Sequence, residues 1–164
     1  MRYAGIIKND TSAGQGVCVS VFVQGCARHC PGCHNQDTWD FNGGKEFTNE
    51  SLMEIIDAIT ANGIERNFCI MGGEPLCQEN MFLTCLLVQT IRDKFPNIKI
   101  YIWTGDTYEN LINNKHDGKL DIIFSKADYL IDGPYIQEER DITLPLRGSR
   151  NQRVIDLREK GALE

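Results

Sequence analysis

The sequence predicts an α/β fold in which helices alternate with parallel strands. Short apolar segments rich in β-branched and aromatic residues alternate along the chain with segments whose apolar residues recur at helical spacing. The stretches that carry glycine, cysteine and carboxylate side chains directly follow the apolar segments. Functional residues at the carboxyl ends of strands are typical of parallel βα architectures. The length of 164 residues fits one domain, residues 1–164, and about five strands are expected, too few to close an eight-stranded barrel.

The composition excludes several classes of protein. Seventeen basic and twenty-three acidic residues give a net charge of −6, which disfavours general binding to nucleic acids or anionic membranes because both need a basic surface. Residues 1–10 hold no apolar core long enough for a signal peptide, and no later apolar run approaches a membrane span. We therefore expect a cytoplasmic protein. There, an odd number of cysteines, seven, favours metal ligation or free thiols over disulfides.

The first predicted strand covers residues 17–23 and runs into the most informative stretch of the chain, residues 25–35. In this stretch Cys26, Cys30 and Cys33 are spaced as Cys-x3-Cys-x2-Cys, and a Pro-Gly pair before the last cysteine permits a tight reversal. Three thiolates on one short loop suit an iron-sulfur cluster. Because such clusters usually have four thiolate ligands, either a distant fourth ligand exists or one iron stays open to a group from outside the protein.

Two other interpretations of this cysteine loop remain open. The three cysteines and the following His34 form an ordinary Cys3His zinc set, although His34 and the adjacent Cys33 have difficulty in reaching the same ion. A disulfide framework needs an oxidising compartment, and nothing in the sequence points to one.

A helix is predicted after a loop at residues 36–45, in which Trp39 and Phe41 either cover the cluster or simply pack. Thr48 is suited to cap this helix and Gly63 to stop it. Its apolar residues recur at helical spacing: Leu52, Ile55, Ile56 and Ile59. A helix with one apolar face should pack on a sheet.

The second predicted strand, residues 68–71, is wholly apolar, as in a parallel sheet that is covered on both faces. It ends in Gly72-Gly73-Glu74-Pro75. Two glycines let a backbone approach a ligand without an intervening Cβ, and the carboxylate beside them can accept a hydrogen bond from an ammonium group. By themselves, these four residues predict a turn.

The rest of the chain continues the alternation of helices and strands. The remaining predicted elements are a helix over residues 78–95, a strand over 98–103, a short helix over 108–114, an exposed turn over 115–118 with a solvated His116, a packing segment over 122–124, and strands over 129–131 and 153–155. The exit loops at residues 104–106 and 132–135 are expected at the same rim as the cysteine loop.

Several side chains allow both a structural and a functional interpretation. Asp132 either contacts a ribose or substrate or braces the turn in which it lies. Cys77 either faces the site or packs, whereas three cysteines are expected in the core: Cys18, Cys69 and Cys85. Four arginines near the C-terminus form a solvated face, a carboxylate clamp for a cofactor or a docking patch for an acidic partner: Arg147, Arg150, Arg153 and Arg158.

The cysteine spacing and the Gly-Gly-Glu-Pro stretch together resemble the radical S-adenosylmethionine superfamily. One departure is Gly32, a position that is often aromatic in that superfamily. Three further stretches extend the resemblance, over nearly the whole chain, to the activating proteins of anaerobic (class III) ribonucleoside-triphosphate reductase: Cys33-His34-Asn35, Asp132-Gly133-Pro134 and Arg147-Gly148-Ser149-x-Asn151-Gln152-Arg153.

The resemblance implies a radical S-adenosylmethionine activase, an oxidoreductase built as a partial, open βα barrel with a side left free for a protein substrate. It implies a [4Fe-4S] cluster with three cysteine ligands, Cys26, Cys30 and Cys33, whose open iron is chelated by the amino and carboxylate groups of S-adenosylmethionine. Residues implied to lie against this cofactor are Gly32, Cys33 and His34, and those implied to bind its methionine end are Gly72, Gly73 and Glu74.

The implied reaction is reductive cleavage of S-adenosylmethionine into methionine and a 5'-deoxyadenosyl radical, which abstracts hydrogen from a glycine of the reductase large subunit and leaves a glycyl radical. The electron comes from a donor such as flavodoxin, and no side chain need act as acid or base. Alternatives within the same chemistry are an activase of another glycyl-radical enzyme, of the pyruvate formate-lyase type, or an enzyme for a small molecule. An alternative from another class is a non-enzymatic zinc-binding interaction module.

Overall fold

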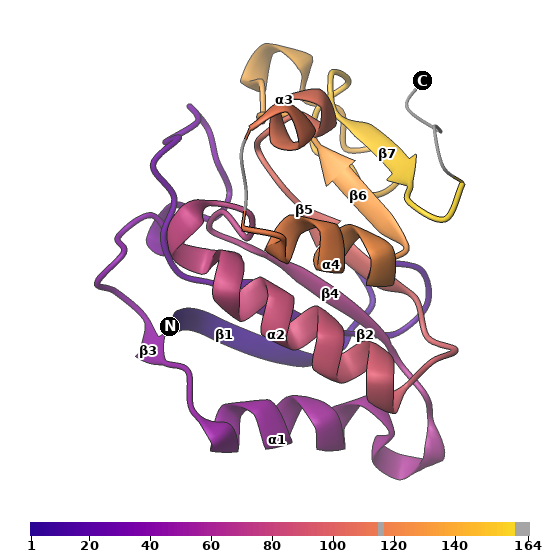
Figure 1. Ribbon diagram of the computed structural model, residues 1–164. Helices are drawn as coiled ribbons and strands as arrows, with labels where there is room; N and C mark the ends of the chain where they lie inside the picture. The colour runs from indigo at the N-terminus through magenta and orange to yellow at the C-terminus, as the bar shows by residue number, and fades with distance from the viewer. Residues whose placement is uncertain (115–116, 160–164) are drawn as a thin grey trace.

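A seven-stranded sheet forms the centre of the computed structural model, which describes residues 1–114 and 117–159 (Figure 1). The strands are β1 (Arg2–Asp10), β2 (Cys18–Val23), β3 (Lys45–Glu46), β4 (Asn67–Gly72), β5 (Ile100–Trp103), β6 (Tyr129–Asp132) and β7 (Arg153–Asp156). Across the sheet they follow the order β3-β1-β2-β4-β5-β6-β7. The central strands β2, β4, β5 and β6 run parallel, whereas β1, β3 and β7 pair antiparallel at the two sides.

Helices α1 (Asn49–Ile59), α2 (Gln78–Lys94) and α4 (Lys119–Lys126) lie along one face of the sheet (Figure 1). The short helix α3 (Tyr108–Asn113) follows β5, and three 3-10 turns complete the description: η1 (Gln36–Thr38), η2 (Ala61–Gly63) and η3 (Gln137–Glu139). Helix α1 begins as predicted, because the Thr48 side chain accepts a hydrogen bond from the Ser51 N–H in a capping box. It ends at Ile59, ahead of the left-handed Gly63.

The parallel strands divide their side chains between two apolar clusters, as the period of two in a strand dictates. On β4, Phe68 and Ile70 pack in the larger cluster with the helices, whereas Cys69 and Met71 pack in a smaller cluster on the opposite face. Strands with apolar residues on both faces explain why these segments read as continuous apolar runs. The prediction of core positions is confirmed for three cysteines, each less than 10% exposed: Cys18, Cys69 and Cys85.

The sides of the sheet differ from the prediction. Strands β1 and β3 were not expected. Strand β1 contains Gly5 and charged residues and buries few of its side chains, so its sequence shows no regular apolar pattern, and it pairs with β2 through two register shifts. Strand β3 has only two residues. The strand predicted at residues 153–155 exists as β7, but it pairs antiparallel with β6. The sheet therefore has four parallel strands where about five were predicted. The segment between β6 and β7, which is described throughout, contains the 3-10 turn η3 and no α-helix that could carry a parallel crossover, and this favours the antiparallel return.

The segment after α3 is described only in part. The predicted turn with His116 falls on Lys115 and His116, which lie outside the described residues. Residues 122–124 belong to α4, which begins after the left-handed Gly118. Within the described part of the chain, no helix has both the length and the apolar character needed to cross a membrane.

Candidate functional site

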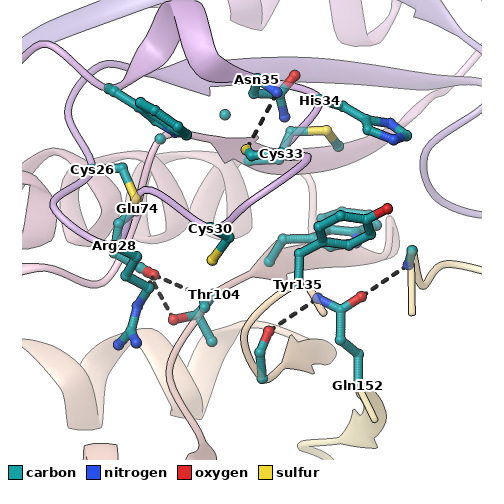
Figure 2. Close-up of a pocket in the computed structure, with 18 residues that line it drawn as sticks. Cys26, Arg28, Cys30, Cys33, His34, Asn35, Glu74, Thr104, Tyr135 and Gln152 are labelled. Atoms are coloured by element: carbon teal, nitrogen blue, oxygen red, sulfur yellow. Dashed lines mark hydrogen bonds and ion pairs between the residues drawn. The ribbon is translucent and has the colours of Figure 1, made fainter. Parts of the chain in front are cut away.

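A cavity of about 290 Å³ lies where the carboxyl ends of the parallel strands meet (Figure 2). Its walls come from the cysteine loop after β2, the Gly-Gly-Glu turn after β4, the segment after β5 and the segment after β6. Gly148 and Gln152, close to β7 in sequence, complete the lining. This arrangement confirms that the exit loops share one rim, which follows from the parallel direction of the strands.

All three cysteines of the loop line this cavity and are partly buried: Cys26, Cys30 and Cys33. The loop is anchored at its start, where the Gly25 and Cys26 N–H groups donate to the Thr38 and Trp39 carbonyls at 2.6 and 3.1 Å. His29, with a left-handed φ of 49°, stacks on Trp39 with ring centroids 4.3 Å apart. Trp39 therefore packs on the cysteine loop, and it also lines the cavity.

The cavity suits a group larger than one metal ion. Among residues 1–114 and 117–159, no three His, Cys, Asp or Glu side chains surround a single ion position. All three thiols line the cavity, where each can ligate one iron of a [4Fe-4S] cluster. His34, the fourth member of the zinc alternative, contacts the Tyr135 ring at a centroid distance of 5.7 Å. The donor set therefore fits a cluster with three thiolate ligands.

Burial affects the chemistry of the first of these thiols. It raises the pKa of Cys26, because removal from water disfavours the thiolate. Metal ligation requires the thiolate, so occupation of the site must displace a proton from Cys26.

The Gly-Gly-Glu turn is joined directly to the start of the cysteine loop. The Gly73 N–H donates to the Val23 carbonyl at 2.9 Å, and the Glu74 N–H donates to the Gly25 carbonyl at 2.8 Å. A Cβ atom at Gly73 would lie 2.4 Å from the Gly25 oxygen, and Gly72 has a left-handed φ of 105°. Both glycines are therefore required by the close approach of two backbones.

The Glu74 carboxylate is buried, with the residue 5% exposed, and it is surrounded by hydrogen-bond donors. Oε1 accepts from the Leu76 N–H at 3.1 Å and from the Thr104 hydroxyl at 2.7 Å, while Oε2 accepts from the Gly105 N–H at 2.7 Å. One side chain thus ties the exit of β4 to the exit of β5.

Arg28 is a site residue that the sequence did not reveal. It lies inside the cysteine spacing, its Nε is 3.4 Å from Oε2 of Glu74, and its Nη2 is 3.3 Å from a carboxylate oxygen of Asp106. Arg28 also lines the cavity (Figure 2). A basic residue between two cysteines of the loop was the available signal, but its partners come from distant exit loops, which spacing alone does not place together.

Asp132 braces the fold. Its side chain is almost fully buried and accepts hydrogen bonds from the Arg153 guanidinium and, at 2.8 Å, from the Tyr108 N–H. Arg153 also pairs with Glu109, and the carboxylates of Asp132 and Glu109 raise the pKa of the arginine. The described residues that line the cavity do not include Asp132. The contacts of Asp132 therefore support the structural interpretation, in which this residue braces the turn.

Replacing Asp132 with asparagine should therefore lower the free energy of unfolding by roughly 1–3 kcal/mol, because a buried charged hydrogen bond to Arg153 is lost. Urea unfolding of the cluster-free chain measures this difference. The control is Asp121→Asn, which changes an exposed aspartate on α4. Unchanged stability combined with weaker S-adenosylmethionine binding would instead identify Asp132 as a ligand contact.

The structure also places Cys77 and two of the four C-terminal arginines, whose roles the sequence left open. Cys77 occupies the N-cap position of α2 without a capping hydrogen bond from its side chain, and it lines a separate hollow with Arg28 and Asp106. Burial raises its pKa to about 12. It therefore remains a protonated thiol at neutral pH. Among the four C-terminal arginines, Arg153 and Arg158 form ion pairs within the fold, the second with Asp128.

Comparisons with known proteins agree with this site. A model of the 4Fe-4S single cluster domain family matches residues 12–155. The anaerobic ribonucleoside-triphosphate reductase-activating proteins of Salmonella typhimurium and Escherichia coli K12 are each 36% identical over 159 residues, covering 96% of this chain and 100% of those proteins. The protein of that name from Enterobacteria phage T4 is 33% identical over 155 residues, covering 94% of this chain and 93% of its own length. This chain therefore belongs to the 4Fe-4S single cluster domain family and to the family of anaerobic ribonucleoside-triphosphate reductase-activating proteins.

Proposed function

We propose that this chain activates anaerobic (class III) ribonucleoside-triphosphate reductase by reductive cleavage of S-adenosylmethionine at a [4Fe-4S] cluster. The observation that carries the proposal is the junction of the three-cysteine loop with the Gly-Gly-Glu turn at one cavity. The chain's relatives, named as activating proteins of this reductase, align over nearly their whole length.

The site residues have distinct proposed roles. Three thiolates hold the cluster and leave one iron without a protein ligand: Cys26, Cys30 and Cys33. The Gly-Gly-Glu turn binds the methionine end of the cofactor through Gly72, Gly73 and Glu74, and Cys33 and His34 lie against it, since all five residues line the cavity. Gly32, which the resemblance also implies at the cofactor, is not among the described residues that line the cavity, and the Gln137 side chain packs over it. When bound, the cluster and cofactor supply a 5'-deoxyadenosyl radical that removes a hydrogen atom from a glycine of the reductase and leaves a glycyl radical there.

The chain itself contributes orientation and exclusion of side reactions, and no side chain need act as a catalytic acid or base. Backbone carbonyls and amides at the strand ends are fixed by the sheet, so they offer a rigid surface to the cofactor. Glu74 and Arg28 keep the exit loops of β4 and β5 together with the cysteine loop. Aromatic rings at the cavity, among them Trp39, Trp103 and Tyr135, displace water from it.

We further propose that residues 1–164 act as one domain and that the parallel strands form a partial, open βα barrel. The helices on one face and the cavity at the strand ends support this view. An incomplete barrel leaves a side through which a glycine-bearing segment of the reductase large subunit can reach the cofactor. The electron comes from a low-potential donor such as flavodoxin, since the reaction consumes one electron from outside the chain.

Metal and sulfide analysis after anaerobic purification tests the cluster half of this proposal. We expect about four irons and four sulfides per chain, the content of one [4Fe-4S] cluster. Zinc without iron or sulfide would favour the interaction module instead. The target is tested by offering the loaded protein either the anaerobic reductase or a pyruvate formate-lyase type enzyme, and by asking which of them acquires a glycyl radical.

A further inference from the structure

The wall of the cavity opposite the cysteine loop is irregular backbone. It consists of residues 133–136, between the end of β6 and the start of η3. Gly133 and Tyr135 of this segment line the cavity (Figure 2). Because no neighbouring strand pairs with it within the described chain, its backbone groups need other hydrogen-bond partners.

Side chains just before β7 supply those partners. Gln152 Nε2 donates to the Gly133 carbonyl at 3.0 Å, and Asn151 Nδ2 donates to the Pro134 carbonyl at 2.8 Å. The Ile136 N–H donates to the Ser149 hydroxyl at 3.2 Å. The polar ending of the chain thus works as a clamp, here called the 149–152 clamp, on the cavity wall.

Gln152 occupies the centre of this clamp. While its Nε2 holds Gly133, its Oε1 accepts from the Gly148 N–H at 2.9 Å and from the Ser149 N–H at 3.1 Å. One amide side chain therefore joins two loops that both border the cavity, as Figure 2 shows. Gln152 itself lines the cavity as well.

The clamped wall also touches the half of the cysteine loop that carries Cys33. The Tyr135 ring lies 5.7 Å from the His34 ring. Nearby, the Gln137 side chain covers Gly32, so closely that a Cβ on this glycine would be 2.8 Å from Cδ of Gln137. Gly32 is the position where an aromatic residue was expected from the superfamily, and Gln137 fills part of the space beside it. Because the wall packs against this loop, a shift of residues 133–136 should also shift the part of the loop that carries Cys33.

We propose that Gln152 is a positioning residue that sets the distance between residues 133–136 and the cysteine loop, and thereby the fit of S-adenosylmethionine in the cavity. This inference rests on the proposed function. It assigns a role to the 149–152 clamp, a segment that the chemistry of the cluster does not require.

Two substitutions at Gln152 distinguish the hydrogen bond that its side chain donates from those that it accepts. Gln152→Glu keeps an acceptor for Gly148 and Ser149 but removes the donor to the Gly133 carbonyl, whereas Gln152→Ala removes both. The matched control is Glu138→Ala, which truncates an exposed side chain of η3, directly after the same wall. Amide hydrogen exchange of the cluster-free chain reports on the clamp, and equilibrium binding of S-adenosylmethionine to the cluster-loaded chain reports on the cavity.

We expect both Gln152 variants to speed exchange in peptides that cover residues 133–136, and only Gln152→Ala to speed it at residues 148–149. Both should weaken S-adenosylmethionine binding by about tenfold, the effect of roughly one hydrogen bond, while iron content and exchange in β4 stay as in the wild type and the control. Tighter or equal binding by both variants would overturn the inference. Weaker binding without faster exchange at residues 133–136 would also overturn it, because Gln152 would then act by direct contact.

The result for the wild-type chain keeps this inference separate from the proposed function. A wild-type chain that loads its cluster but does not bind S-adenosylmethionine contradicts the proposed function. A wild-type chain that binds the cofactor, together with Gln152 variants that bind it equally well, contradicts only the role of the clamp.

Discussion

Replacing Cys30 with alanine should abolish both cluster binding and the formation of a glycyl radical. Cys30 is the middle thiol of the loop, and the cavity offers a cluster three thiolates from this loop. A cluster that already lacks a fourth protein ligand is left with two when Cys30 is removed. The expected loss is therefore complete and not graded. Iron and sulfide content and the visible absorbance after anaerobic reconstitution measure it.

A second cysteine provides the matched control for this variant. Cys77→Ser removes a thiol outside the loop and places a serine at the start of α2, where serine is a favourable N-cap. This variant should keep its iron and its activity. If Cys77→Ser also lost the cluster, Cys77 would be a fourth ligand and no iron would be open to the cofactor. Full cleavage of S-adenosylmethionine by Cys30→Ala would contradict the assignment of the loop.

Replacing Glu74 with alanine should have the second largest effect, on cofactor binding and on stability together. The substitution leaves the Thr104 hydroxyl and the Gly105 and Leu76 N–H groups without their acceptor. It also leaves Arg28 with Asp106 as its remaining ion-pair partner in the described chain. The loss of a buried, hydrogen-bonded carboxylate should lower the free energy of unfolding by roughly 3–5 kcal/mol. S-adenosylmethionine binding should weaken, while the cluster's absorbance remains largely intact.

Glu74→Gln separates the charge from the shape of this side chain. The amide keeps one acceptor oxygen, so one of the two backbone donors retains a partner, and the expected loss of stability is about 1–3 kcal/mol. Urea unfolding of the cluster-free chain and equilibrium binding by the loaded chain measure the two effects. Glu50→Gln, an exposed carboxylate in the first turn of α1, is the control and should change neither by much. Unchanged cofactor affinity in both Glu74 variants would count against the proposed role of the turn.

The sequence predicted the parallel strands and the placement of the motifs at their ends because both follow from local pattern. Apolar runs mark strands covered on both faces, and parallel direction brings their exits to one rim. For this reason the cysteine loop and the Gly-Gly-Glu turn could be placed together before their hydrogen bonds at Gly25 were known.

Contacts between distant segments could not be predicted in the same way. The distant partners of Glu74 come from the exit loop of β5 and from the cysteine loop, and those of Asp132 come from α3 and β7. Nothing local in the sequence specifies such pairs. Arg28 was missed for the same reason. Strand β1 was missed because a strand with few buried side chains lacks a regular apolar pattern.

The most direct measurement of the central claim is electron paramagnetic resonance of the anaerobic reductase after incubation with the cluster-loaded chain, a reductant and S-adenosylmethionine. We expect a glycyl radical on the reductase, accompanied by release of 5'-deoxyadenosine and methionine, and a change in the signal when the reductase carries α-deuterated glycine. The same incubation with Cys30→Ala should give no radical. A folded, cluster-loaded wild-type chain that cleaves S-adenosylmethionine yet leaves the reductase without a glycyl radical would contradict the account.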